Sequence, residues 1–171
     1  TNLMVITGVN WVEEVPDCDR VRTLISERFV EPYPRFRQKV VNDAMGAQWV
    51  TDDDFDIHRH VVRETLKRRK GQSRQAALQA RCAELATQAL EPDRPLWQFH
   101  LIEQYDGGSA LIARIHHCIG DGIALTSVVM SITDGGELPP QRPDDEHAHE
   151  DWLAGAVIRP PSVVAEEGRA R

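Results

Sequence analysis

Apolar residues recur along the chain with two different periods, and each period predicts a different kind of element. Short segments that alternate, or that are apolar throughout, predict strands at residues 4–12, 48–50, 97–104 and 109–116. Segments with an apolar residue every three or four positions predict helices at residues 17–29, 73–90 and 123–130. Residues 36–41 and 57–62 are also expected to be extended. We therefore expect an α/β sandwich, with a mixed sheet whose helices pack on one face.

Two of the predicted helices carry clear apolar stripes. Asp17 precedes the first helix as a candidate N-cap. The apolar residues of that helix that share one face are Val21, Leu24, Ile25 and Phe29. The stripe of the second helix consists of Leu78, Cys82, Leu85 and Ala89. Each stripe is wide enough to pack against a sheet.

A hairpin near the middle of the chain ends in a cluster of chemically active residues. Residues 105–108 read Tyr-Asp-Gly-Gly, a turn signal between two apolar strands. The returning strand leads into residues 114–122, which read Arg-Ile-His-His-Cys-Ile-Gly-Asp-Gly. A tight loop between a strand and the helix predicted after it can hold a side chain rigidly at the mouth of a cleft.

The residue types in this loop suit proton transfer. An imidazole titrates near neutral pH, so His117 can act as a general base. His116 would point the opposite way in an extended backbone and is expected to have a supporting role. Asp121 would orient the imidazole or brace the loop by pairing with Arg114. Gly122 allows backbone angles that other residues resist.

Composition narrows the class of protein. The 171 residues are 41% hydrophobic and 27% charged, which suits one globular domain. A net charge of -7 and a pI of about 5.5 argue against a nucleic-acid partner. No apolar run approaches the roughly 20 residues that would span a bilayer. The three widely spaced cysteines indicate reduced thiols in an intracellular protein.

Other reactive side chains have weaker functional interpretations. His58 and His60 would share one face of an extended segment, but no further ligands occur at a recognisable spacing, so we expect no metal. Cys118 could be a thiol nucleophile, but adjacent side chains rarely face one substrate, so the interpretation is disfavoured beside His117.

Two groups of basic residues leave alternatives open. Arg35 and Arg37 are expected on a solvated face, and the alternative is contact with a phosphate of a bound ligand. Residues 67–70 read Lys-Arg-Arg-Lys and are expected to be a solvated loop. The alternative for this run is contact with anionic lipid head groups or with a nucleotide.

Four segments together carry a family resemblance. The His-His-x-x-x-Asp-Gly pattern of residues 116–122 resembles the active-site motif of CoA-dependent acyltransferases, a superfamily that includes chloramphenicol acetyltransferase-like enzymes and nonribosomal peptide condensation domains. In order and spacing, three further segments resemble the bacterial wax ester synthase/diacylglycerol acyltransferase family: residues 33–39, 54–61 and 95–103. The resemblance covers roughly residues 4 to 135.

The resemblance implies a chloramphenicol acetyltransferase-like fold of two halves with a tunnel between them. Residues 1–137 would form the N-terminal acyltransferase domain, and residues 138–171 a linker toward a C-terminal half that this chain lacks. The second histidine of the motif, His117, would be the base, Asp121 would mainly hold the loop, and Gly122 would keep the substrate channel clear. A phosphate that the basic groups could contact would belong to acyl-coenzyme A (acyl-CoA).

The implied reaction moves a fatty acyl group from acyl-CoA to the hydroxyl of diacylglycerol or of a long-chain alcohol. No cofactor or metal is required, and acyl-CoA is the co-substrate. The expected location is cytoplasmic, with peripheral association with a membrane or lipid droplet. The alternatives are a related enzyme that uses a carrier-protein thioester, a non-catalytic lipid-binding half-domain, and an unrelated metal or thiol hydrolase.

Overall fold

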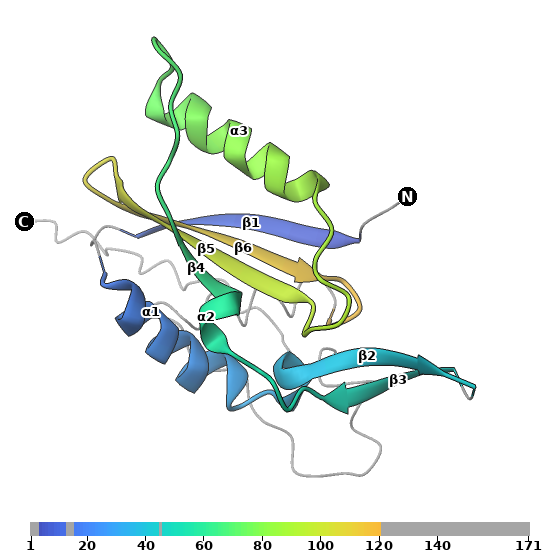
Figure 1. Cartoon of the computed structure of the whole chain (residues 1–171). Coiled ribbons are helices and arrows are strands. Elements are labelled where there is room, and N and C mark those ends of the chain that lie inside the picture. Colours follow the sequence, from blue (N-terminus) through green and yellow to red (C-terminus); the bar gives the residue numbers. More distant parts are fainter. Residues whose placement is uncertain (1–3, 13–15, 45, 121–171) are drawn as a thin grey trace, which may run out of the picture.

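Four strands form the central sheet of the computed structural model, which describes residues 4–12, 16–44 and 46–120 (Figure 1). The order across the sheet is β1-β6-β5-β4. The bounds are β1 Val5–Val12, β4 Val61–Glu64, β5 Trp97–Tyr105 and β6 Gly108–His116. β6 runs antiparallel to both β1 and β5, whereas β4 runs parallel to β5, so the sheet is mixed as predicted.

Helices and a second, two-stranded sheet complete the described part of the chain. The helices are α1 Cys18–Ile25, which continues as a π-helical turn Ser26–Val30, then a 3-10 turn Pro34–Arg37, α2 Ile57–His60 and α3 Arg74–Thr87. The small sheet is a hairpin of β2 Gln38–Asp43 and β3 Gly46–Thr51, and it extends away from the central sheet (Figure 1).

The two long helices pack on opposite faces of the sheet, so the prediction of helices on one face is wrong. Figure 1 shows α1 and α3 on either side of the strands. Successive side chains of a strand point to opposite faces of the sheet, so one strand can contribute to the core on each face. On β5, Phe99 and Leu101 belong to the core under α1, and Ile102 belongs to the core under α3.

The two long helices bury most of the stripes that their sequence periods predicted. Val21, Ile25 and Phe29 are buried against the sheet, and Leu24 packs partly against the same core. On α3, Leu78 and Leu85 are buried and Cys82 is partly buried, but Ala89 lies beyond the end of the helix and is exposed. Burial of these stripes, rather than helix propensity, holds both helices in place.

The hairpin that leads to the histidines is confirmed. Tyr105 pairs with Gly108 across a two-residue turn. Asp106 and Gly107 both have positive φ, at 50° and 89°. Two adjacent left-handed residues define the tight turn that matches the right-handed twist of a hairpin, which is why Asp-Gly is favoured there.

Two segments expected to be extended begin instead with a helical turn. Residues 57–60 form α2, because the Asp56 carboxylate accepts a hydrogen bond from the His58 backbone N–H (2.9 Å) and starts the turn. Phe36 lies in the 3-10 turn Pro34–Arg37, and the strand starts only after it. Proline at the first position of that turn has the φ that a helical turn needs.

Some expectations concern residues that the structure does not describe. The helix predicted at residues 123–130 and the boundary at residue 137 lie outside the described residues and stay predictions. Within the described residues, no helix is both long and apolar enough to cross a membrane. Asp17 stands at the N-cap of α1 as expected, but its side chain makes no capping hydrogen bond.

Candidate functional site

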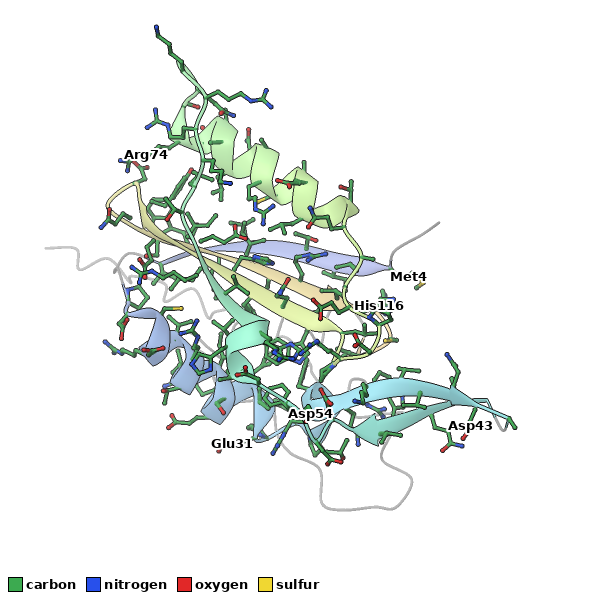
Figure 2. The ribbon with its side chains drawn as sticks, in the orientation of Figure 1. Met4, Glu31, Asp43, Asp54, Arg74 and His116 are labelled. Carbon is green, nitrogen blue, oxygen red and sulfur yellow. The ribbon has the colours of Figure 1, made fainter. Side chains whose placement is uncertain are left out.

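The histidine pair lies at the end of β6 and is fixed there by backbone hydrogen bonds to both neighbouring strands. The His116 N–H donates to the Leu96 carbonyl (2.9 Å), just before β5. The His117 N–H donates to the Met4 carbonyl (2.7 Å), just before β1. Figure 2 shows Met4 and His116 at the same end of the sheet. The two contacts hold the backbone of the motif from both sides.

The His116 side chain closes the turn that follows the strand. Its Nδ1 accepts a hydrogen bond from the Cys118 N–H (3.1 Å), and its backbone carbonyl accepts one from the Ile119 N–H (3.0 Å). Partial burial, with a smaller contribution from the adjacent His117, lowers the pKa of the His116 imidazole. A neutral imidazole is what this geometry needs, because Nδ1 must keep its lone pair to accept the hydrogen bond.

The His117 side chain is exposed. It makes no hydrogen bond or ion pair with another described residue. The His117 imidazole is therefore exposed and has no partner among the described residues, while its backbone is anchored to Met4. The other residues predicted for the motif, Asp121 and Gly122, lie outside the described residues.

Arg114, the predicted partner of Asp121, has its own contacts on the α3 face of the sheet. Its Nη2 donates to the Gln88 carbonyl, at the end of α3, and its Nη1 lies 3.4 Å from Gln98 Oε1. No carboxylate of the described residues pairs with it. The pairing with Asp121 stays a prediction.

Arg35 lies close to the motif. Its guanidinium stacks over the Trp49 ring at 4.2 Å, and burial lowers its pKa. The positive charge also partly opposes the effect of lost hydration on the Cys118 thiol, whose pKa is nevertheless raised. A raised pKa leaves less thiolate, which weakens the interpretation of Cys118 as a nucleophile.

The Pro-Leu-Trp segment, residues 95–97, packs in the core that supports the site. Trp97 is 1% exposed, and its indole Nε1–H donates to the Phe36 carbonyl (2.8 Å). The ring stacks on that of His60 with centroids 4.4 Å apart, and the His60 Nδ1–H donates to the Trp97 carbonyl (2.8 Å). Burial lowers the pKa of His60 and keeps it neutral at neutral pH.

A polar network under α3 was not predicted from the sequence. Arg81 donates two hydrogen bonds to the Glu64 carboxylate (2.9 and 2.6 Å), and the His100 Nδ1 lies 2.9 Å from the same group. The Arg81 hydrogen bonds lower the pKa of Glu64. Glu64 and His100 belong to neighbouring strands, and Arg81 lies on the stripe between Leu78 and Leu85. The sequence does not show that these residues meet, because their contact depends on the pairing of β4 with β5.

Metal ligation finds no support in the described residues. No group of three or more His, Cys, Asp or Glu side chains there could hold an ion. His58 is exposed and bonds to Asp56, whereas His60 is buried under Trp97, so the two do not share a face. The basic run of residues 67–70 is exposed, as predicted for a solvated loop.

Comparison with known proteins gives a family match over most of the chain. Residues 2–162 match the family model of the wax ester synthase/diacylglycerol acyltransferase catalytic domain. Two Mycobacterium tuberculosis proteins, "Probable diacyglycerol O-acyltransferase tgs1" and "Probable diacyglycerol O-acyltransferase tgs3", are each 33% identical over 123 residues, or 70% of this chain. The matched region is 26% of the first relative and 44% of the second, so the chain spans less than half of each.

Solved structures share the fold. The wax ester synthase/diacylglycerol acyltransferase from Marinobacter aquaeolei VT8 matches with a TM-score of 0.58 and 23% identity, over 74% of this chain and 33% of its own. A condensation domain of the enacyloxin polyketide synthase matches with a TM-score of 0.63 and 18% identity, over 90% of this chain and 31% of its own. These likenesses confirm the chloramphenicol acetyltransferase-like fold class predicted from the sequence.

Proposed function

The chain belongs to the wax ester synthase/diacylglycerol acyltransferase catalytic-domain family, and on that premise we propose that the complete enzyme is an acyl-CoA-dependent O-acyltransferase. It transfers a fatty acyl group from acyl-CoA to the hydroxyl of diacylglycerol or of a long-chain alcohol. The products are triacylglycerol or wax ester, together with free CoA. The observation that carries the proposal is the exposed His117 imidazole on a backbone held by both flanking strands.

In the proposed mechanism His117 is the general base. Its imidazole takes the proton of the acceptor hydroxyl, and the oxygen attacks the thioester carbonyl carbon. The tetrahedral intermediate collapses, the carbon–sulfur bond breaks, and the CoA thiolate leaves. The imidazolium then protonates that thiolate, so the enzyme returns to its starting state. No covalent enzyme intermediate forms.

The neighbouring residues position this base. His116 is engaged in the turn through its Nδ1, which supports a structural role for its side chain. Asp121 is proposed to hold the loop, and Gly122 to leave the substrate channel clear. The partner that completes the tunnel is proposed to be the C-terminal half of the same enzyme.

Comparing histidine variants of the complete protein tests the assignment. Release of CoA from a fatty acyl-CoA is measured with diacylglycerol and with a long-chain alcohol. His117→Ala is expected to lower the rate by about 10²- to 10⁴-fold, the usual contribution of a positioned base. His116→Ala retains a measurable part of the activity. His58→Ala, which replaces an exposed histidine of α2, is the matched control and retains full activity. Equal rates for His117→Ala and the unsubstituted enzyme contradict the proposal.

The acyl donor separates the proposal from its nearest alternatives. A condensation-type enzyme would need the acyl group on a carrier protein, whereas the proposed enzyme uses free acyl-CoA. A non-catalytic lipid-binding protein would bind acyl-CoA without releasing CoA. One assay with both donors, in which turnover on free acyl-CoA is expected, distinguishes all three.

The oily acceptors also suggest a location. We propose that the enzyme is cytoplasmic and attaches peripherally to a membrane or lipid droplet, where such substrates accumulate. Fractionation of cells into soluble, membrane and droplet material tests this.

A further inference from the structure

A pocket of about 430 Å³ lies where β5 begins and β6 ends, on the α3 side of the histidine motif. Three arginines line it: Arg59 from α2, Arg94 from the segment before β5, and Arg114 from β6. Among the described residues, Glu91 is the one carboxylate in its wall, and the chain that follows α3 closes another side. The mechanism proposed above makes no use of this pocket.

Arg114 is a buried cation that lacks an anion among the described residues. It is 2% exposed, and its guanidinium meets only neutral acceptors, the Gln88 carbonyl and the Gln98 side chain. Its buried Nε has no acceptor at all in this part of the chain. Burial lowers the pKa of Arg114, because the charged guanidinium loses hydration that no described anion replaces. Buried charges are normally paired, because an isolated one costs several kcal/mol.

The rest of the wall does not neutralise this charge. The Glu91 carboxylate pairs with Arg94 (Nε–Oε2 2.5 Å) and makes no ion pair with Arg114. Arg59 has only a distant, solvent-exposed neighbour in Asp56, at 3.8 Å. Among the described residues, Arg114 therefore has no anionic partner and Arg59 has only a weak one. A phosphate monoester carries close to two negative charges at pH 7 and suits the forked donors of arginine.

We propose that this pocket is a binding site for the phosphate group of a phosphorylated ligand. The choice of ligand rests on the proposed function, since acyl-CoA is a phosphorylated co-substrate. A pocket of this volume receives one phosphate with its ester linkage rather than the whole coenzyme. Arg114 precedes the motif on the same strand, so the site and the catalytic loop share one support.

Calorimetric titration of the complete protein at low salt tests the site without requiring turnover. The probes are inorganic phosphate, adenosine 3′,5′-bisphosphate and CoA, with dephospho-CoA to separate the 3′-phosphate from the diphosphate. Arg59→Gln and Arg94→Gln are expected to weaken binding of phosphate about tenfold and threefold, because Glu91 already holds the charge of Arg94 whereas Asp56 lies 3.8 Å from Arg59. Arg20→Gln, an exposed arginine on α1, is the matched control and leaves the affinity unchanged.

Arg114→Gln is expected to abolish phosphate binding, with circular dichroism used to check that this buried variant folds. If it does not fold, the two partly exposed arginines still decide the question. Phosphate affinities that are equal in Arg94→Gln, Arg59→Gln and the unsubstituted protein overturn the proposal. Binding that appears only in Asp121→Asn also overturns it, because the motif carboxylate would then occupy the pocket. Either failure leaves the outcome for His117→Ala untouched, so the two proposals fail separately.

Discussion

His60 shows how the packing around one side chain sets its chemistry. The imidazole lies between the rings of Phe55 and Trp97, with centroids 5.0 and 4.4 Å away. The same residue type at position 58, two positions earlier, is exposed. The sequence disfavours both as metal ligands but does not separate their environments, and the local packing decides that His60 is buried and His58 is not. Its lowered pKa has a consequence for stability.

We expect His60 to make the folded state less stable as the pH falls. Its pKa is lower in the folded than in the unfolded protein, so between the two values the unfolded chain binds more protons. Stability therefore drops as the pH falls below about 6.5, by up to about 1.4 kcal/mol per pH unit. In His60→Gln this loss is absent, so the stability gap between the two proteins narrows from pH 7 to pH 5. Urea unfolding at both pH values measures the gap, and a constant gap contradicts the prediction.

The β5–β6 hairpin shows which local signals specify a whole element. The Asp-Gly turn and a shift in pairing between Ile102 and Tyr105 together set its register, and the register carries the motif to the end of β6 beside Leu96 and Met4. At Gly107 a Cβ would meet nothing within 4 Å, so only backbone conformation restricts this position. A substitution at Gly107 therefore measures the free-energy cost of the backbone conformation without a steric clash.

Gly107→Ala is expected to destabilise the protein by about 1–2 kcal/mol, because a Cβ disfavours positive φ. Gly8→Ala on β1 is the matched control, since a Cβ there also meets nothing within 4 Å and the backbone is not left-handed. Its effect is expected within about 0.5 kcal/mol of zero or slightly stabilising. Thermal unfolding of both variants measures the difference, and similar losses at the two positions would contradict the argument.

Trp97 joins distant parts of the molecule. It hydrogen-bonds to the 3-10 turn through Phe36, stacks on α2 through His60, and contacts Phe29 of the π-helical turn (centroids 5.4 Å apart). These segments come from widely separated parts of the chain and meet around one indole. The support beneath the histidine motif is therefore a property of the assembled molecule.

Trp97→Phe is expected to lower the free energy of unfolding by about 2–4 kcal/mol. The substitution leaves a cavity and removes the donor to the buried Phe36 carbonyl. Trp11→Phe on β1 is the control: that ring is 48% exposed, so we expect a loss below about 1 kcal/mol. Denaturant unfolding compares the two, and a Trp97 variant as stable as the Trp11 variant would show that the indole does not tie the segments together.

The sequence by itself determined the strands, the long helices, the hairpin turn and the identity of the family. Each depends on a local signal: a period of buried residues, two turn residues, or four motifs in order. The 3-10 turn and α2 were missed, because one or two residues decide such short turns. The helices were also assigned to one face, because periodicity shows that a stripe is buried but not what covers it.

Only the tertiary structure decided which side chains meet. Arg35 lies beside the motif, and Glu64, Arg81 and His100 form one network. The arginines at positions 59, 94 and 114 line one pocket although they lie on separate segments. The physical reason is that strand pairing and helix docking bring together residues distant in sequence, and the free energy of that packing belongs to the whole chain.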